Sequence, residues 1–273
     1  MRVGVIGAGS AGSRHAKIFS FLGEVSTYDV IPDKAQQRDQ RSLMEWADAI
    51  VIATPPSTHV ALLEECIDRR LPVLVEKPLA TDSKGLAKLL RQAALKKVLV
   101  MVGYQWRYAA SLQGFKTMAL RIEKRYWVSG MYSQGLTFRP TPSWLHDPEE
   151  GGCLLENSHL IDMLVFLFGR FAVIHATIRD AIVLMEIAWT PDCHGQIEMD
   201  HLYPGTIGEI VVVGNKSVAK WDRLQETDLG RLYGIQAAHF IDVIEHPQIT
   251  PKVTGWDGLA VLEIAEEARR CSR

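Results

Sequence analysis

The sequence predicts an α/β protein with two domains: an N-terminal doubly wound parallel sheet, then an α+β domain with an open, mostly antiparallel sheet. Three observations predict it. Short apolar runs alternate with helical patterns over the first hundred residues. Longer β-like segments follow one another after about residue 108. The chain of 273 residues also exceeds the ~150 residues typical of one domain. We therefore predict domains over residues 1–108 and 109–273.

The strands of the first domain are predicted from short apolar runs, which suit strands buried on both faces. They are expected at Val3–Ile6, Val25–Tyr28, Ala49–Ala53, Val73–Val75 and Val98–Val102. Helical patterns lie between them at Ser10–Phe21, Ser42–Ala47, Ser57–Asp68 and Ser83–Ala94. Strands separated by helices predict a parallel sheet with right-handed crossovers. The polar segment between Asp29 and Ser42 contains no visible strand.

The second domain is predicted from looser alternation over longer segments. β-like segments run over Trp127–Phe138, Ile182–Met199 and Gly208–Val218, with helices at Leu154–Phe168, Leu232–Glu245 and Trp256–Arg270. An open sheet of this kind leaves one face bare. We therefore expect a homodimer or homotetramer formed through the C-terminal sheet.

Composition excludes several classes of protein. Hydrophobic residues make up 47% of the chain, which is typical of a folded protein. The formal net charge of -2 favours neither nucleic acid nor a membrane as partner. No signal peptide fits before the first strand, so we expect a cytoplasmic protein. The four cysteines form no CxxC pair, and Cys193, His194 and His201 match no metal-ligand spacing, so no metal site is predicted.

A G-x-G-x-x-G motif follows the first strand and opens the first helix: Gly7-Ala8-Gly9-Ser10-Ala11-Gly12. This context is the one that the dinucleotide-binding fingerprint requires. Gly7 permits a tight turn, Gly9 lets backbone approach a pyrophosphate, and Gly12 lets helix and strand pack closely. We predict cofactor contacts from Gly7, Gly9, Ser10, Ala11 and Gly12. The alternative is a glycine-rich turn that binds nothing.

Asp29 ends the second strand, where a carboxylate can accept hydrogen bonds from the adenosine ribose. Its charge would repel the 2′-phosphate of NADP, so the sequence favours NAD. Two alternatives stay open: Asp29 only caps the turn Val30–Asp33, or Arg14, just beyond the glycine turn, meets the phosphate of NADP.

Two further motifs stand at strand ends, on the sheet edge where ligands bind in such folds. Thr54-Pro55-Pro56 follows the third strand, and Glu76-Lys77-Pro78 follows the fourth. We predict cofactor contacts from Thr54, Pro55, His59, Glu76 and Lys77. Lys77 can also hydrogen-bond a substrate hydroxyl and stabilise the alkoxide that forms. A position of His59 on the helix surface and of Lys77 in a surface loop are the alternatives.

The segment from Gly151 to Asp162 carries a second group of chemical residues. Glu156, His159 and Asp162 stand three residues apart, so one helix would present them on one face. Histidine titrates near neutral pH and can exchange a proton with a carbinol oxygen. The alternative is a buried histidine that is hydrogen-bonded within the fold.

Taken in order, these motifs resemble the glucose-fructose oxidoreductase / inositol dehydrogenase (Gfo/Idh/MocA) family. The resemblance rests on Gly7 to Gly12, Ala53 to His59, Glu76-Lys77-Pro78, Gly103 to Tyr108 and Gly151 to Asp162. It runs from residue 1 to about residue 170, and the last helix is similar as well. The chain resembles a compact member, shortened between Gly12 and Ser42 and after Arg170. The acid stands three residues before His159 rather than four.

The resemblance implies a Rossmann domain that binds NAD or NADP and oxidises or reduces a carbinol carbon of a sugar, sugar derivative or cyclitol. Lys77 would contact the reacting hydroxyl, His159 would exchange its proton beside Glu156, and the Lys77–Pro78 bond would be cis. The predicted substrate contacts are Arg107, Tyr104, Asp162 and Trp144. A non-catalytic NAD- or sugar-binding sensor and an NAD-assisted glycosidase are the alternative functions.

Overall fold

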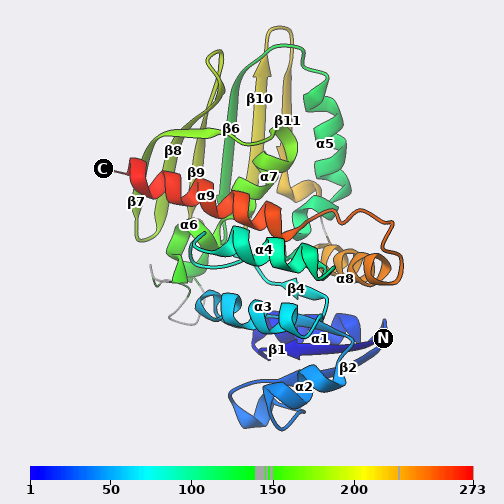
Figure 1. Ribbon diagram of the computed structural model, residues 1–273. Coiled ribbons are helices and arrows are strands. Elements are labelled where there is room, and N and C mark those ends of the chain that lie inside the picture. Colours follow the sequence, from blue (N-terminus) through cyan, green and yellow to red (C-terminus); the bar gives the residue numbers. More distant parts are fainter. Residues whose placement is uncertain (139–144, 146, 148–149, 227, 273) are drawn as a thin grey trace. The chain divides into compact units, whose positions relative to one another are not determined.

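The computed structural model describes residues 1–138, 145, 147, 150–226 and 228–272. The chain forms two compact units, each built around one sheet (Figure 1). The first comprises Met1–Gln105 and Leu229–Leu259, and the second Trp106–Asp228 and Ala260–Arg273. Helix α8 (Leu229–Glu245) thus belongs to the first unit, although it follows the second sheet in sequence. The predicted domains, residues 1–108 and 109–273, placed residues 229–259 in the second domain, whereas these residues pack in the first unit.

The first unit has five parallel strands in the order β2-β1-β3-β4-β5, which confirms the predicted parallel sheet. The strands are β1 (Arg2–Ile6), β2 (Glu24–Tyr28), β3 (Ala49–Ile52), β4 (Val73–Val75) and β5 (Val100–Val102). The helices between them are α1 (Ser10–Phe19), α2 (Gln40–Trp46), α3 (His59–Asp68) and α4 (Leu86–Leu95).

Helices cover both faces of this sheet. Val3 and Val5 of β1 point to one face, where they form a core with Phe19 of α1 and Phe240 of α8. Gly4 points to the other face, where a side chain would collide with Leu43 of α2. Both faces are therefore buried, which explains the continuous apolar runs in the strands.

Strand β2 is the edge of the first sheet. As predicted, residues 29–42 contain no strand; a short 3₁₀ turn, η1 (Pro32–Lys34), leads toward α2. The segment after η1 lies along β2 instead. The backbone N–H groups of Gln36 and Gln37 both donate to the carbonyl of Thr27, at 2.9 and 3.0 Å. The Thr27 N–H donates to Oε1 of Gln36 at 3.1 Å. This edge is thus partly paired by a loop.

The second unit holds a six-stranded sheet in the order β11-β10-β6-β9-β8-β7. Only the central pair β6–β9 is parallel, which confirms the predicted, mostly antiparallel sheet. The strands are β6 (Arg125–Ser133), β7 (Ala172–Arg179), β8 (Ile182–Thr190), β9 (Cys193–Asp200), β10 (Ile207–Gly214) and β11 (Val218–Asp222). Two segments predicted as continuous, Ile182–Met199 and Gly208–Val218, are each divided by a tight turn. Strand β7 and helix α5 (Ala110–Leu120) were not predicted.

The predicted helix Leu154–Phe168 is wrong in one respect: it is two helices, α6 (Gly152–Glu156) and α7 (His159–Phe168). The buried side chain of Asn157 stabilises the break, because its Nδ2 donates to the carbonyls of Cys153 and Asp200, each at 3.2 Å. Nε2 of Gln134 donates to the carbonyl of Glu156 at 2.8 Å, which satisfies the end of α6.

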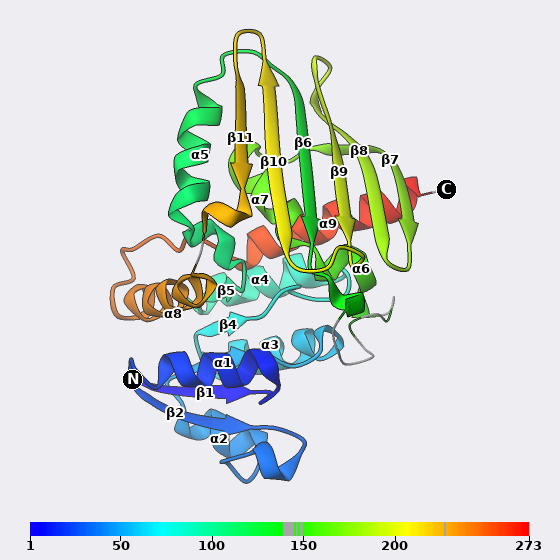
Figure 2. The same cartoon turned by 180° about the vertical axis from the view of Figure 1, so that it is seen from behind.

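Helices cover one face of the second sheet. Helix α7 lies so close to β6 that a side chain at Gly130 would come within 2.9 Å of Leu160. Helix α9 (Gly255–Cys271) contributes an ion pair between Glu263 and Arg170. The opposite face carries no helix of the described residues, as Figure 2 shows from behind. Among the described residues, no helix is both long and apolar enough to cross a membrane.

Candidate functional site

The glycines of the turn in the first unit have two separate functions: two of them form the turn, and one leaves space beside helix α1. Gly7 has a φ of +90°, and a side chain there would lie 2.6 Å from the carbonyl oxygen of Ala53. A side chain at Gly12 would lie 1.7 Å from the carbonyl oxygen of Gly7. Gly9, by contrast, has open space where its side chain would be. Gly7 and Gly12 therefore build the turn, whereas Gly9 leaves room beside the start of α1, where Ser10 and Ala11 form the first helical residues.

Asp29 holds the glycine turn from the side. Its Oδ2 accepts a hydrogen bond from the N–H of Ala8 at 2.6 Å, and its Oδ1 accepts one from Ile31 at 2.8 Å. The second bond caps the turn after β2, which agrees with the alternative interpretation of Asp29 as a turn cap. Each carboxylate oxygen can still accept another hydrogen bond, so a ribose hydroxyl remains compatible with this geometry. The guanidinium of Arg14 lies over the ring of Tyr233, 4.7 Å from its centroid.

His59 joins the two turns at the ends of β3 and β4. The side chain is fully buried, so it does not lie on the helix surface. Its Nε2 lies 2.9 Å from the carbonyl oxygen of Thr54, and its Nδ1 lies 2.9 Å from that of Pro78. Thr54 also bonds Thr58 through their hydroxyls at 2.6 Å. His59 thus fixes the backbone on both sides of this edge, while its direct contact with a cofactor stays a prediction.

Glu76 is the centre of a polar group next to Lys77, with its side chain 12% exposed. Its Oε1 lies 2.6 Å from Nε2 of His15, and its Oε2 accepts a hydrogen bond from the backbone N–H of Lys77 at 3.2 Å. A side chain at Gly103 would come within 2.8 Å of Oε2, so Glu76 lies directly against this glycine. The Lys77–Pro78 bond is cis, as predicted. Glu76 therefore positions the backbone from which the Lys77 side chain extends.

His15 and Tyr233 were missed by the sequence reasoning. His15 is 1% exposed and packs edge-on against Tyr233 of α8, whose hydroxyl accepts a hydrogen bond from Gln105 at 3.1 Å. One signal was available for His15: it lies between Gly12 and Phe19 on the buried stripe of α1. A histidine on the apolar face of a helix needs a polar partner, and here that partner is Glu76.

His159 begins α7 in the second unit and is 4% exposed. Its ring centroid lies 5.9 Å from that of Tyr132 on β6. The Tyr132 hydroxyl accepts a hydrogen bond from Nε1 of Trp106 at 3.2 Å. Burial raises the pKa of Tyr132 to about 12, so the ring stays neutral at physiological pH. Tyr132 was not predicted, because its contact with His159 joins segments far apart in sequence.

The carboxylates near His159 differ from the prediction. Asp162 lies on α7, but its Oδ1 is 2.7 Å from the guanidinium of Arg107, and both side chains are buried. Glu156 ends α6 instead of sharing one continuous helix with His159. The predicted stripe is therefore wrong for Glu156, whereas His159 and Asp162 do lie three residues apart on one helix. Arg107 and Asp162 form a buried pair, and their contact with substrate stays a prediction.

Tyr104 and Trp144 are the remaining two predicted substrate contacts. Tyr104 is fully buried in the first unit, and its contact with substrate stays a prediction. Trp144 lies outside the described residues.

Comparison with known proteins shows which family the first part of the chain resembles. Residues 1–104 match the Gfo/Idh/MocA family, described as an oxidoreductase family with an NAD-binding Rossmann fold. This match confirms the predicted resemblance over this part of the chain. Inositol 2-dehydrogenase 4 of Saccharopolyspora erythraea is 35% identical over 126 residues, 40% of this chain and 37% of that protein. Inositol 2-dehydrogenase of Acidothermus cellulolyticus is 32% identical over 134 residues, 42% and 39% of the two lengths. The matches therefore span less than half of these relatives.

Solved structures resemble the whole chain in fold. GenD2 from gentamicin A biosynthesis, in complex with NAD, has a TM-score of 0.89 at 18% identity, covering 100% of this chain and 94% of that one. The WlbA dehydrogenase of Bordetella pertussis, in complex with NADH and UDP-GlcNAcA, has a TM-score of 0.86 at 20% identity, covering 100% and 96%. These similarities establish the fold of both units.

Gly9→Ala and Gly12→Ala are expected to separate the structural function of the glycine turn from its function in binding the cofactor. Gly12→Ala lowers the unfolding temperature, because its new carbon collides with rigid backbone. Gly9→Ala leaves that temperature unchanged but weakens NAD binding by at least about tenfold, because the carbon enters the space that the pyrophosphate needs. Thermal unfolding and tryptophan fluorescence during NAD titration measure both effects. Gly114→Ala, in open space on α5, is the control. An unchanged NAD affinity in Gly9→Ala would contradict this division.

His15→Phe is expected to destabilise the protein by about 1–3 kcal/mol, because the largely desolvated carboxylate of Glu76 then loses this donor. His15→Gln carries an amide N–H near the position of Nε2 and is expected to recover most of that loss. Urea unfolding followed by circular dichroism measures the free energies. Equal losses in the two variants would show that packing, and not the hydrogen bond to Glu76, is what His15 provides.

Proposed function

We propose that the chain is an NAD-dependent oxidoreductase that transfers a hydride between nicotinamide and the carbinol carbon of a sugar, sugar derivative or cyclitol. The observation that carries this proposal is the glycine turn, open at Gly9 and flanked by the carboxylate of Asp29, in a unit that matches an NAD-binding family. The inositol 2-dehydrogenases among its relatives support a polyol-type substrate.

The residues of the first unit fit a dinucleotide. The pyrophosphate would lie at the start of α1, where backbone N–H groups and the helix dipole favour an anion. Asp29 would accept a hydrogen bond from the adenosine ribose, and its charge favours NAD over NADP. Thr54 and Pro55 would line the same sheet edge, on backbone that His59 holds in place. NAD, when bound, supplies the carbon that accepts or returns the hydride.

We expect two side chains to act on the reacting hydroxyl of the substrate. During oxidation, His159 takes the hydroxyl proton, and the Lys77 ammonium stabilises the negative charge that develops on the oxygen. Glu76 supports this role of Lys77, because it fixes the backbone N–H at that residue. Contact with Tyr132 supports the role of His159, because it limits the orientations of the imidazole.

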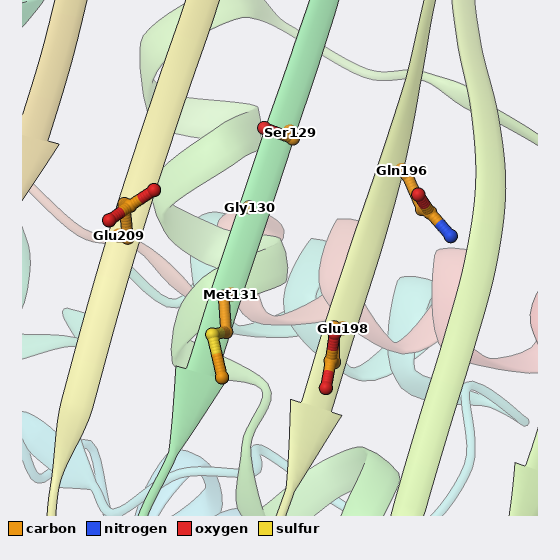
Figure 3. A pocket seen from close by; sticks show the side chains of 6 residues that line it. All are labelled: Ser129, Gly130, Met131, Gln196, Glu198 and Glu209. Atoms are coloured by element: carbon orange, nitrogen blue, oxygen red, sulfur yellow. The ribbon is translucent and has the colours of Figure 1, made fainter.

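We further propose that copies of the chain form a dimer or tetramer through the bare face of the second sheet. This face has a shallow hollow across β10, β6 and β9, and Figure 3 shows side chains projecting along its walls. The hollow is lined by Ser129, Gly130, Met131, Gln196, Glu198 and Glu209. Trp127, on the same face of β6, is 40% exposed. The exposed ring of Trp127 on this helix-free face favours an interface.

His159→Ala and Lys77→Met are each expected to lower turnover by roughly 10²–10⁴, the range for an acid–base residue. NADH absorbance during incubation with NAD and a panel of polyols and sugars measures turnover. His194→Ala and Lys216→Met, both exposed in the second unit, are the matched controls. Unchanged turnover in both test variants would reject the roles of His159 and Lys77. NAD binding without turnover of any compound would favour a sensor. Glycoside hydrolysis without NADH accumulation would favour a glycosidase.

Met131→Glu is expected to dissociate the assembly, because it adds a third carboxylate beside Glu198 and Glu209. Sedimentation velocity measures the mass of the species in solution. Lys88→Glu, exposed on α4, is the control and keeps the wild-type mass. A wild-type protein that sediments as a monomer, or a Met131→Glu variant that keeps the wild-type mass, would reject this interface.

A further inference from the structure

Arg223 is a cation that the proposed chemistry does not use. It lies in the 3₁₀ turn η7 (Arg223–Gln225), directly after β11. Its Nε is buried and has no hydrogen-bond partner among the described residues. Two other arginines of the second unit form ion pairs: Arg107 with Asp162, and Arg170 with Glu263. A buried guanidinium nitrogen without an acceptor is costly, so this atom indicates a ligand.

The surroundings of Arg223 place it beside Tyr132. Gly208 on β10 pairs with Tyr132 on β6 in the sheet register. A side chain at Gly208 would come within 3.0 Å of the Tyr132 ring and 3.2 Å of Cβ of Arg223. Arg223 and Tyr132 therefore both pack closely against Gly208, which places them side by side. The charge of Arg223 also acts on the ring, since it lowers the pKa of Tyr132 against the larger effect of burial.

His159 lies against the same ring of Tyr132, at a centroid distance of 5.9 Å. We call His159, Tyr132 and Arg223 the Tyr132 cluster. It combines a proton-exchanging imidazole, a neutral aromatic ring and a guanidinium within the second unit. A sugar whose reacting hydroxyl meets His159 would lie along Tyr132, with another of its groups toward Arg223.

We propose that Arg223 binds an oxyanion, the carboxylate or phosphate group of an acidic sugar, and so selects anionic over neutral substrates. A guanidinium can donate two parallel hydrogen bonds to either group, which gives both affinity and orientation. This assignment rests on the proposed function, since it names the class of substrate that His159 acts on.

The test is binding of matched sugars to the full chain with NAD present. D-glucuronate and D-glucose 6-phosphate are each compared with D-glucose by isothermal titration. Quenching of Trp106 and Trp221, whose rings lie 5.6 Å apart near the Tyr132 cluster, is a second readout. We expect at least one acidic sugar to bind about tenfold more tightly than glucose. The two acidic sugars distinguish a carboxylate site from a phosphate site.

Arg223→Met is expected to remove this preference and leave the affinity for glucose unchanged. Arg223→Lys keeps the charge but loses the planar donor pair, so it keeps only part of the preference. Arg179→Met, exposed on β7 of the same unit, is the control. Equal affinities for acidic and neutral sugars in the wild type, or a preference that survives in Arg223→Met, would overturn the assignment. If Arg223→Met does not fold, Arg223→Lys decides: a full wild-type preference there overturns it as well.

Failure of this assignment is distinguishable from failure of the proposed function. The sugar preference is measured as binding and needs no turnover. The proposed function is tested instead by NADH formation and by the His159 and Lys77 variants. A protein that oxidises polyols without any preference for acidic sugars loses only the role of Arg223.

Discussion

The approach of Gly12 to the carbonyl of Gly7 is the constraint on which the first unit depends. It holds helix α1 against the end of β1, closer than any side chain would permit. The same helix carries His15 to Glu76, which lies at the end of a different strand. One close contact thus fixes both the start of α1 and the support beneath Lys77. The turn for the dinucleotide and the edge that carries Lys77 are therefore parts of one rigid arrangement.

In the second unit, the position of a candidate catalytic residue depends on a break between two helices. Asn157 is buried at the break between α6 and α7 and bonds the carbonyl of Asp200 at the end of β9. The break makes His159 the first residue of α7, where it meets Tyr132. The adjacent pair of Arg107 and Asp162 keeps two opposite charges buried together, which is costly to separate.

Local patterns predicted what depends on local physics. The strands of the first sheet were found because both faces are buried, which leaves an apolar run in the sequence. Once these strands are located, the glycine turn after β1 and the position of Lys77 after β4 can also be predicted. The partners were not predictable: His15 and Glu76 are 61 residues apart, and Arg107 and Asp162 are 55 apart. The helix break depends on a bond between residues 43 apart, which no helical periodicity records.

The loop beside β2 has a consequence for the protein in a crowded solution. A sheet that stops at β2 would expose a row of unsatisfied peptide groups, which invites strand addition from another molecule. Gln36 and Gln37 occupy part of that row: both backbone N–H groups donate to the Thr27 carbonyl, and the Gln36 side chain accepts from the Thr27 N–H. The loop thus protects this edge of the first sheet against pairing with a strand of another molecule, although it forms no strand itself.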